Sequence, residues 1–256
     1  MLFALEFPPL GHIVDWPGFA GTEGAWYEFN KVALVCMMAA FLSVIIFLLG
    51  NKKQLVPTGA QNLAEVAVEF IEEQLIKPTI GHTEKRWIPP FMLALFFYIL
   101  FTNIFEVIPI IQMPANARIA LPMFLALLCY VIYHGAGFKE HGPIGYLKHA
   151  LIPPGVPGFL LPLVALIEFV SKFLVQPFSH TVRLFANLLA GHILLVTFAV
   201  LSAGLWTAQW YVIFLPLPAF AMVFFTAFEV MVSFLQAYVF AILFGVYYGA
   251  ATSHEH

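Results

Sequence analysis

The sequence predicts an all-α protein that crosses a membrane several times. Of its 256 residues, 62% are hydrophobic and only 10% are charged, and the mean hydropathy is +0.92. Soluble domains are about 45–50% apolar and about 25% charged, so this composition favours the bilayer as solvent. The apolar residues also fall in runs of about 20 or more, the length that a helix needs to cross roughly 30 Å of hydrocarbon.

Three runs of spanning length lie in the first part of the chain. They cover residues 31–50, KVALVCMMAAFLSVIIFLLG, then about 88–111 and about 119–138. A Pro- and Gly-rich connection over 139–157 follows the third run. We predict one membrane helix for each run, because each has about the length of the hydrocarbon layer.

The segment 61–77, QNLAEVAVEFIEEQLIK, has a different pattern. Its glutamates recur at three- and four-residue spacing on one side of a helix, and apolar residues such as Leu63, Val66 and Phe70 fall on another. Pro78 is expected to end this helix. The pattern favours an amphipathic helix on the cytoplasmic surface of the membrane or against a partner, and an ordinary connecting helix is the alternative.

The last two apolar runs, 159–206 and 210–251, are too long to stand upright in a bilayer. About 40 helical residues reach about 60 Å, about twice the hydrocarbon thickness. Pro177 is expected to bend the first run, and Pro216 with Pro218 to delay the start of the second. We predict a long antiparallel hairpin, tilted strongly toward the membrane plane and packed against another protein. Upright helices that extend beyond the membrane are the alternative.

The distribution of lysine and arginine predicts the orientation of the chain. Residues 1–30 contain four acids and no lysine or arginine, whereas residues 51–87 contain five lysines and arginines. Positive residues gather on the cytoplasmic side of membrane proteins. We therefore predict an external N-terminal segment 1–30, five crossings and a cytoplasmic C-terminus.

Charged residues within the apolar runs are candidates for function, because each costs about 2.5–3.5 kcal/mol at a helix centre. Glu168 and Lys172 are four residues apart, which predicts an ion pair on one helix face, while a polar entrance is the other interpretation. Arg183 has no acid three or four residues away and keeps its charge. Its anion could come from Glu106, from Glu229 or from another subunit.

Polar residues form one edge along each of the two long runs. The edge of the first contains Glu168, Lys172, Gln176, Ser179, Arg183 and Asn187, and that of the last contains Glu229, Ser233 and Gln236. Two such edges on neighbouring helices can enclose water and relay protons. His192 with Glu229 is the predicted titrating pair, and Asn103 with Glu106 would extend a path outward. A structural histidine and a helix–helix hydrogen bond are the competing interpretations.

Three motifs carry a resemblance to a known family: RLFANLLAGH at 183–192, FEVMVSFLQAYVFAILFGVYY at 228–248 and TNIFEVIP at 102–109. With the layout of five spans, the chain resembles the a subunits of F-type ATP synthase, the membrane stator of its proton channel. The resemblance implies that the long hairpin lies against a rotating ring of c subunits. It also implies that Arg183 faces a carboxyl group of that ring and separates two aqueous half-channels.

The resemblance also implies roles for the other polar residues. Those of the outward-opening path would be Asn103, Glu106, Asn187, His192, Glu229 and Gln236, and that of the inward-opening path would be Glu168. Lys172 is expected in the inward-opening path because it lies on the same helix edge as Glu168. His192 and Glu229 stand in the order of mitochondrial-type members, which leaves open which of them titrates. The resemblance does not explain Lys172.

The expected partners are the c-ring, a b-type peripheral stalk subunit, the rest of the synthase, the lipid bilayer and protons. No nucleic acid, cofactor or metal is expected, and the chain is expected to perform no chemistry by itself. The expected location is a bacterial plasma membrane. A secondary transporter with an intramembrane proton relay is the alternative, although the inverted repeats typical of transporters are not visible in the sequence. The size of the ring and the choice of proton or sodium stay open.

Overall fold

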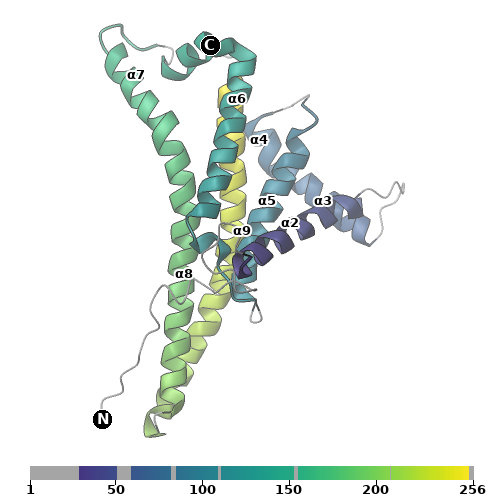
Figure 1. Ribbon diagram of the computed structural model, residues 1–256, viewed down its shortest axis with the longest axis vertical. Coiled ribbons are helices and arrows are strands. Elements are labelled where there is room, and N and C mark those ends of the chain that lie inside the picture. The colour runs from purple at the N-terminus through teal and green to yellow at the C-terminus, as the bar shows by residue number, and fades with distance from the viewer. Residues whose placement is uncertain are drawn as a thin grey trace. The chain divides into compact units, whose positions relative to one another are not determined.

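The computed structural model describes residues 29–50, 59–81, 85–108, 111–152, 155–207 and 209–253 (Figure 1). Helices account for nearly all of these residues, and no strand occurs among them. The predicted all-α fold is confirmed. The predicted external segment 1–30 lies almost wholly outside the described residues, as do Lys52 and Lys53, so the predicted orientation of the termini stays a prediction.

The chain divides into two compact units, and each is described by itself. Unit 1 comprises residues 1–45, 97–118 and 185–237, and unit 2 comprises residues 46–96, 119–184 and 238–256. The long helices pass from one unit into the other. Each unit therefore contains a part of the first half of the chain together with a part of the long helices at its end.

Helix α2 covers Lys31–Gly50, as predicted for the first apolar run. The predicted amphipathic segment is divided into α3, Ala60–Ile71, the π-helix η1, Glu72–Ile76, and the short α4, Lys77–Thr79. Its four glutamates are exposed, and so are Leu63 and Val66 of the apolar side, which was expected to face the membrane surface or a partner. Lys77 donates a hydrogen bond to Glu73, which raises the pKa of Lys77.

Helix α5 covers Ile88–Val107 and ends four residues before the predicted boundary. Pro109 explains the difference, because a proline disfavours the helical conformation of the residue before it. A single 3-10 turn, η2, follows at Ala115–Ala117.

Helix α6, Ala120–Leu151, is longer than the predicted span 119–138 and includes much of the predicted connection. Gly142 interrupts it with φ 71° and ψ 167°, values that glycine reaches without steric cost. Pro143 follows, where a helix that starts anew needs no N–H donor. The pair Gly142–Pro143 therefore divides α6 into two helical stretches that meet at a kink.

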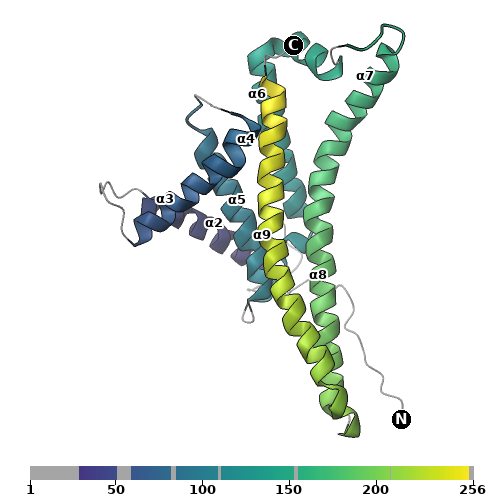
Figure 2. The same cartoon turned by 180° about the vertical axis from the view of Figure 1, so that it is seen from behind.

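The first long run forms α7, Leu161–Phe169, the π-helix η3, Val170–Val175, and α8, Gln176–Thr207 (Figures 1 and 2). The π-helix ends at Val175, two residues before Pro177. A proline ring clashes with the carbonyl four residues earlier, and a π-helix widens the turn at that point. The helix therefore continues past Pro177, and the π-helix η3 is the local distortion that accompanies the proline.

The second long run begins with the 3-10 helix η4, Gln209–Phe214, and continues as α9, Pro216–Thr252. The start of α9 at Pro216 agrees with the predicted delay. Pro216 occupies the first position of α9, where its missing N–H costs no intrahelical hydrogen bond.

Four helical stretches in the described part of the chain are long and apolar enough to cross a membrane, namely Ile88–Val107, Ala120–Leu151, Leu161–Trp206 and Val212–Thr252. Helix α2 is apolar over Lys31–Ile46, a shorter stretch. Many large apolar side chains are exposed, including Phe41, Phe124 and Phe220, as expected of surfaces that contact lipid. The fifth crossing and the strong tilt of the hairpin stay predictions.

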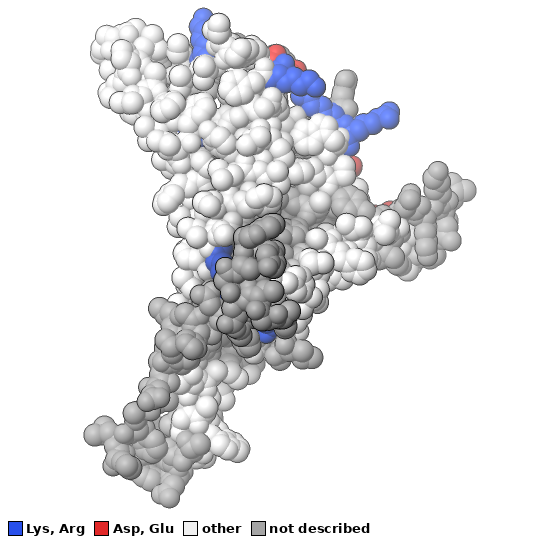
Figure 3. Space-filling model, in the orientation of Figure 1, with Lys and Arg blue, Asp and Glu red and all other residues white. Residues whose placement is uncertain are grey.

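The polar end of unit 2 is visible in Figure 3, where most lysine and arginine atoms on this face gather around the end of α6. One ion pair at this end joins Lys85 to Glu140 at 3.0 Å. Trp87 and Phe91 pack on Tyr248 and Phe244 of α9, with ring centroids 5.7 Å and 5.0 Å apart. These contacts fasten the start of α5 to the end of α9 within unit 2.

Candidate functional site

A group of buried polar side chains lies in unit 1, and we call it the unit 1 cluster: Thr102, Asn103, Glu106, Asn116, His192 and Glu229. Asn116 in η2 donates hydrogen bonds to Thr102 Oγ1 at 2.9 Å and to Asn103 Oδ1 at 2.6 Å. These bonds fold the segment after α5 back onto the end of that helix. Asn103 Nδ2 and Asn116 Oδ1 have no hydrogen-bond partner among the described residues and are available to water.

Glu106 and His192 form an ion pair between α5 and α8 when the imidazole is protonated. The distance from Oε1 of Glu106 to Nδ1 of His192 is 3.1 Å, and the two side chains are 1% and 10% exposed. Isolated charges are costly in such an environment, and the pair lets the two groups neutralise each other.

Glu229 of α9 lies against Gly191 of α8. A Cβ atom built on Gly191 would lie 2.6 Å from Oε2 of Glu229 and closer still to Oε1 and Cδ. The glycine therefore makes room for the carboxyl group. The charge of Glu106 also acts on Glu229. Two carboxyl groups and one imidazole thus share the cluster, which is a set of groups able to pass protons among themselves.

The structure brings together four of the six residues predicted for the outward-opening path, with one difference in pairing. The ion-pair partner of His192 is Glu106, whereas the sequence pattern paired His192 with Glu229. Gln236 is buried on α9, and Asn187 is exposed on α8. For these two, the described part of unit 1 provides no hydrogen bond to the cluster.

Two members of the cluster, Thr102 and Asn116, were not predicted. Thr102 stands beside Asn103 in the motif TNIFEVIP. Asn116 lies fourteen residues beyond Thr102, in a turn between two predicted membrane helices. Thr102 could have been predicted from its place near Glu106 on the same helix. Asn116 could not, because helical spacing relates only residues of one helix and Asn116 lies in a turn.

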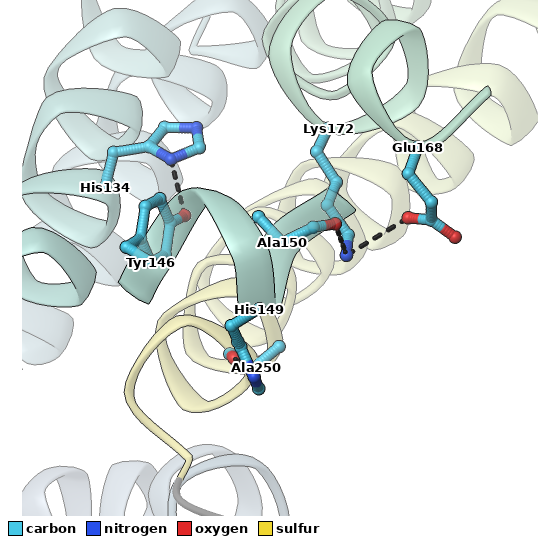
Figure 4. A network of polar contacts seen from close by, with 7 residues as sticks. All are labelled: His134, Tyr146, His149, Ala150, Glu168, Lys172 and Ala250. Carbon is cyan, nitrogen blue, oxygen red and sulfur yellow. Dashed lines mark hydrogen bonds and ion pairs between the residues drawn. The ribbon is translucent and has the colours of Figure 1, made fainter. Parts of the chain in front are cut away.

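Lys172 of η3 makes two contacts in unit 2 (Figure 4). Its Nζ pairs with Oε2 of Glu168 at 3.1 Å, which confirms the ion pair that the four-residue spacing predicts. The same Nζ donates a hydrogen bond to the carbonyl oxygen of Ala150 at 2.6 Å. Ala150 lies in the last turn of α6, where carbonyls lack intrahelical partners and a cation is favourable. Lys172 therefore fastens η3 to the end of α6.

A cavity of about 50 Å³ lies beside Lys172 within unit 2. Most of its wall is polar or aromatic, and it is lined by Tyr133, His134, Tyr146, His149, Ala150, Lys172, Gln176, Tyr247, Ala250 and Ala251. Tyr133 donates a hydrogen bond of 3.4 Å to Oε1 of Gln176, and His149 lies 3.3 Å from the carbonyl oxygen of Ala250 (Figure 4). The tyrosines and histidines of this wall were not predicted as site residues.

Arg183 lies on α8, half-buried, in the part of the helix that belongs to unit 2. Its charge acts on His180 and on Tyr247, whose rings are 5.3 Å apart. No described side chain of unit 2 forms a hydrogen bond or ion pair with its guanidinium group. Among the residues with described positions, no three His, Cys, Asp or Glu side chains are arranged to hold a metal ion.

These features define an all-α integral membrane protein whose long apolar helices bury ionisable side chains. The chain matches the family described as "ATP synthase A chain" over residues 32–249. It is 36% identical to the ATP synthase subunit a of Nocardioides sp., over 97% of this chain and 94% of that protein. The identity is 38% to the protein of the same name from Methylobacterium sp., over 98% and 96%, and 40% to that of Rhodopseudomonas palustris, over 89% of each.

The chain therefore belongs to the family of a subunits of F-type ATP synthase. The family match favours the synthase subunit over the alternative of a secondary transporter.

Proposed function

We propose that this chain is the proton-conducting stator subunit of an F-type ATP synthase, and that Arg183 faces the carboxyl groups of a ring of c subunits. The observation that carries the proposal is that Arg183 lies in an apolar helix and has no anionic partner among the described residues of its own unit. A guanidinium group keeps its charge, so it needs an anion where water is scarce. A ring that presents one carboxyl after another would supply that anion.

The surface of α8 next to Arg183 suits a close neighbour. Ala186, Asn187 and Ala190 are exposed and follow Arg183 at three-, four- and seven-residue spacing. Small residues at such spacing allow the backbones of two membrane helices to approach closely. This face is therefore the one that we assign to the c-ring, and Asn187 would contact the ring beside Arg183.

The charge of Arg183 would perform two tasks. A fixed cation favours the ionised form of a nearby carboxyl group, which promotes release of its proton. The same cation repels a hydrated proton that would pass directly between the two half-channels. Protons would then cross only by riding on the ring. Each charge that crosses supplies about 2.3 kcal/mol per 100 mV of membrane potential.

The two half-channels follow from the polar residues of each unit. We assign Asn103, Glu106, His192 and Glu229 of the unit 1 cluster, together with Asn187 and Gln236, to the outward-opening path. We assign Glu168 and Lys172 to the inward-opening path, in which Lys172 holds the wall through its bond to Ala150. The membrane would be a bacterial plasma membrane with the N-terminus outside, and a b-type stalk subunit would hold the chain against rotation.

The substitution Arg183→Ala tests the proposal in inverted membrane vesicles that contain the complete complex. Loss of the guanidinium group should abolish ATP-driven acidification and ATP synthesis, while the amount of assembled complex stays unchanged. Arg86→Ala is the matched control, because Arg86 is exposed and lies before the start of α5. Near-normal proton pumping by Arg183→Ala would overturn the proposed function.

A further inference from the structure

His134 and Tyr146 form a buried hydrogen-bonded pair that no part of the proposed mechanism uses. The Nδ1 atom of His134 lies 2.6 Å from the hydroxyl group of Tyr146, and the two residues are 5% and 4% exposed (Figure 4). They are twelve residues apart on α6. They meet because the break at Gly142 turns the last part of α6 back toward the first.

A second glycine makes the pair possible. A Cβ atom built on Gly137 would lie 2.6 Å from Cδ2 of Tyr146 and 3.0 Å from the carbonyl oxygen of Ala251. A side chain at position 137 would therefore displace the Tyr146 ring from His134. Two glycines on one helix thus hold the pair at the wall of the cavity.

The other nitrogen of the imidazole is also placed for exchange. His134 Nε2 is buried and has no hydrogen-bond partner among the described residues. The cavity that His134 and Tyr146 line measures about 50 Å³, whereas about 10–15 Å³ on this measure holds one water molecule. A cavity of this size has room for several water molecules beside the hydroxyl, imidazole, amide and ammonium groups in its wall.

The side chains that pack against His134 are aromatic. The rings of Tyr130, Tyr133 and Tyr146 surround it, and Phe173 of η3 stacks on it at 4.8 Å. None of these carries a fixed charge. Three further charged or titratable side chains line the same cavity, namely Lys172, His149 and Tyr247. A fourth, Glu168, forms an ion pair with Lys172.

Two residues of the cavity wall relate it to Arg183. The charge of Arg183 acts on Tyr247, and Gln176, which accepts a hydrogen bond from Tyr133, stands two helical turns before Arg183 on α8. The wall that includes Lys172 therefore also includes a residue on which the charge of Arg183 acts.

We infer that this cavity is a hydrated section of the inward-opening proton path, and that the His134–Tyr146 pair is a proton-exchange site in its wall. The inference rests on the proposed function and extends it to residues that carry no assigned role. His134 takes a proton from cavity water at Nε2, becomes an imidazolium and returns the proton to water. The Tyr146 hydroxyl accepts a hydrogen bond from Nδ1–H throughout the exchange and holds the ring in place.

Hydration is tested with a cysteine at Gln176 in a chain whose native thiols are removed by Cys36→Ala and Cys129→Ala. Silver ions are added to inverted vesicles, and protection of the thiol from later alkylation is measured by mass spectrometry. We expect Gln176→Cys to be protected. The control is Val131→Cys, which is 66% exposed on the apolar surface of α6 and should stay unprotected. Equal behaviour of the two cysteines would overturn the hydrated cavity.

Proton exchange is tested with His134→Gln and Tyr146→Phe in the complete complex. Glutamine keeps a polar group toward Tyr146 but does not take up a proton, so ATP-driven acidification should fall about tenfold and lose much of its dependence on the inner-side pH. Tyr146→Phe keeps the ring and should reduce the rate less. Tyr130→Phe is the matched control, because Tyr130 packs on the same imidazole but does not line the cavity, and it should behave like the native chain.

The outcomes separate this inference from the proposed function. A native rate and pH profile for His134→Gln, with pumping still abolished by Arg183→Ala, would overturn the exchange site alone. Pumping that survives Arg183→Ala would overturn the proposed function, whatever the result at His134. If His134→Gln lowered the amount of complex, the silver experiment and Tyr146→Phe would still decide, because neither removes the imidazole.

Discussion

The substitution Gly191→Ala should block proton transport by moving one carboxyl group. The new methyl group would lie 2.6 Å from Oε2 of Glu229 and closer to Oε1 and Cδ, whereas ordinary contact begins near 3.4 Å. The carboxyl group must therefore retreat by about 1 Å or more. Because it ends a flexible side chain, it can move without unfolding the helices.

Two magnitudes separate the effect on stability from the effect on transport. Alanine favours a helix over glycine by about 1 kcal/mol, so the helix itself should not be weakened. A misplacement of about 1 Å at a site of proton transfer can reduce the rate by about 100-fold. We expect normal amounts of complex with ATP-driven acidification reduced by one to two orders of magnitude.

The assay is acidification of inverted vesicles, quenched by a pH-sensitive dye, with the amount of complex measured in parallel. Gly135→Ala is the control, because a Cβ atom there meets no heavy atom within 4 Å. Adding Glu229→Asp to Gly191→Ala shortens the displaced side chain and should restore part of the rate. A native rate for Gly191→Ala would refute the role of the Glu229 carboxyl position, and loss of the complex would refute the claim that the methyl group is tolerated.

Two further substitutions test contacts of unit 2. Lys172→Ala removes the hydrogen bond to Ala150 and should lower the free energy of unfolding by about 1 kcal/mol. Glu168→Gln removes only the charge of the ion-pair partner and should lower it less. An unchanged melting temperature of the purified complex with Lys172→Ala would contradict the role of Lys172 at the end of α6. Gly137→Ala forces the Tyr146 ring away and should cost about 1–3 kcal/mol in the same measurement, whereas Gly158→Ala, where a Cβ atom meets no heavy atom within 4 Å, should cost little.

The sequence alone determined the fold class, because composition and run length state directly which segments prefer lipid. It also determined contacts that lie within one helix. The ion pair of Glu168 and Lys172 follows from a spacing of four residues, and the late start of α9 follows from Pro216. The isolation of Arg183 from nearby acids in its own helix was equally readable, since a helix brings only residues three and four apart onto one face.

Only the tertiary structure decided which residues meet across helices. Spacing along a chain does not say that His192 pairs with Glu106 of α5, or that Asn116 in a turn bonds to Asn103. The cavity beside His134 depends on a break at Gly142 and on a missing side chain at Gly137, and neither feature has a hydrophobic period that a sequence pattern could reveal. Periodicity describes one helix at a time, whereas the close approach of two helices depends on the shapes of both.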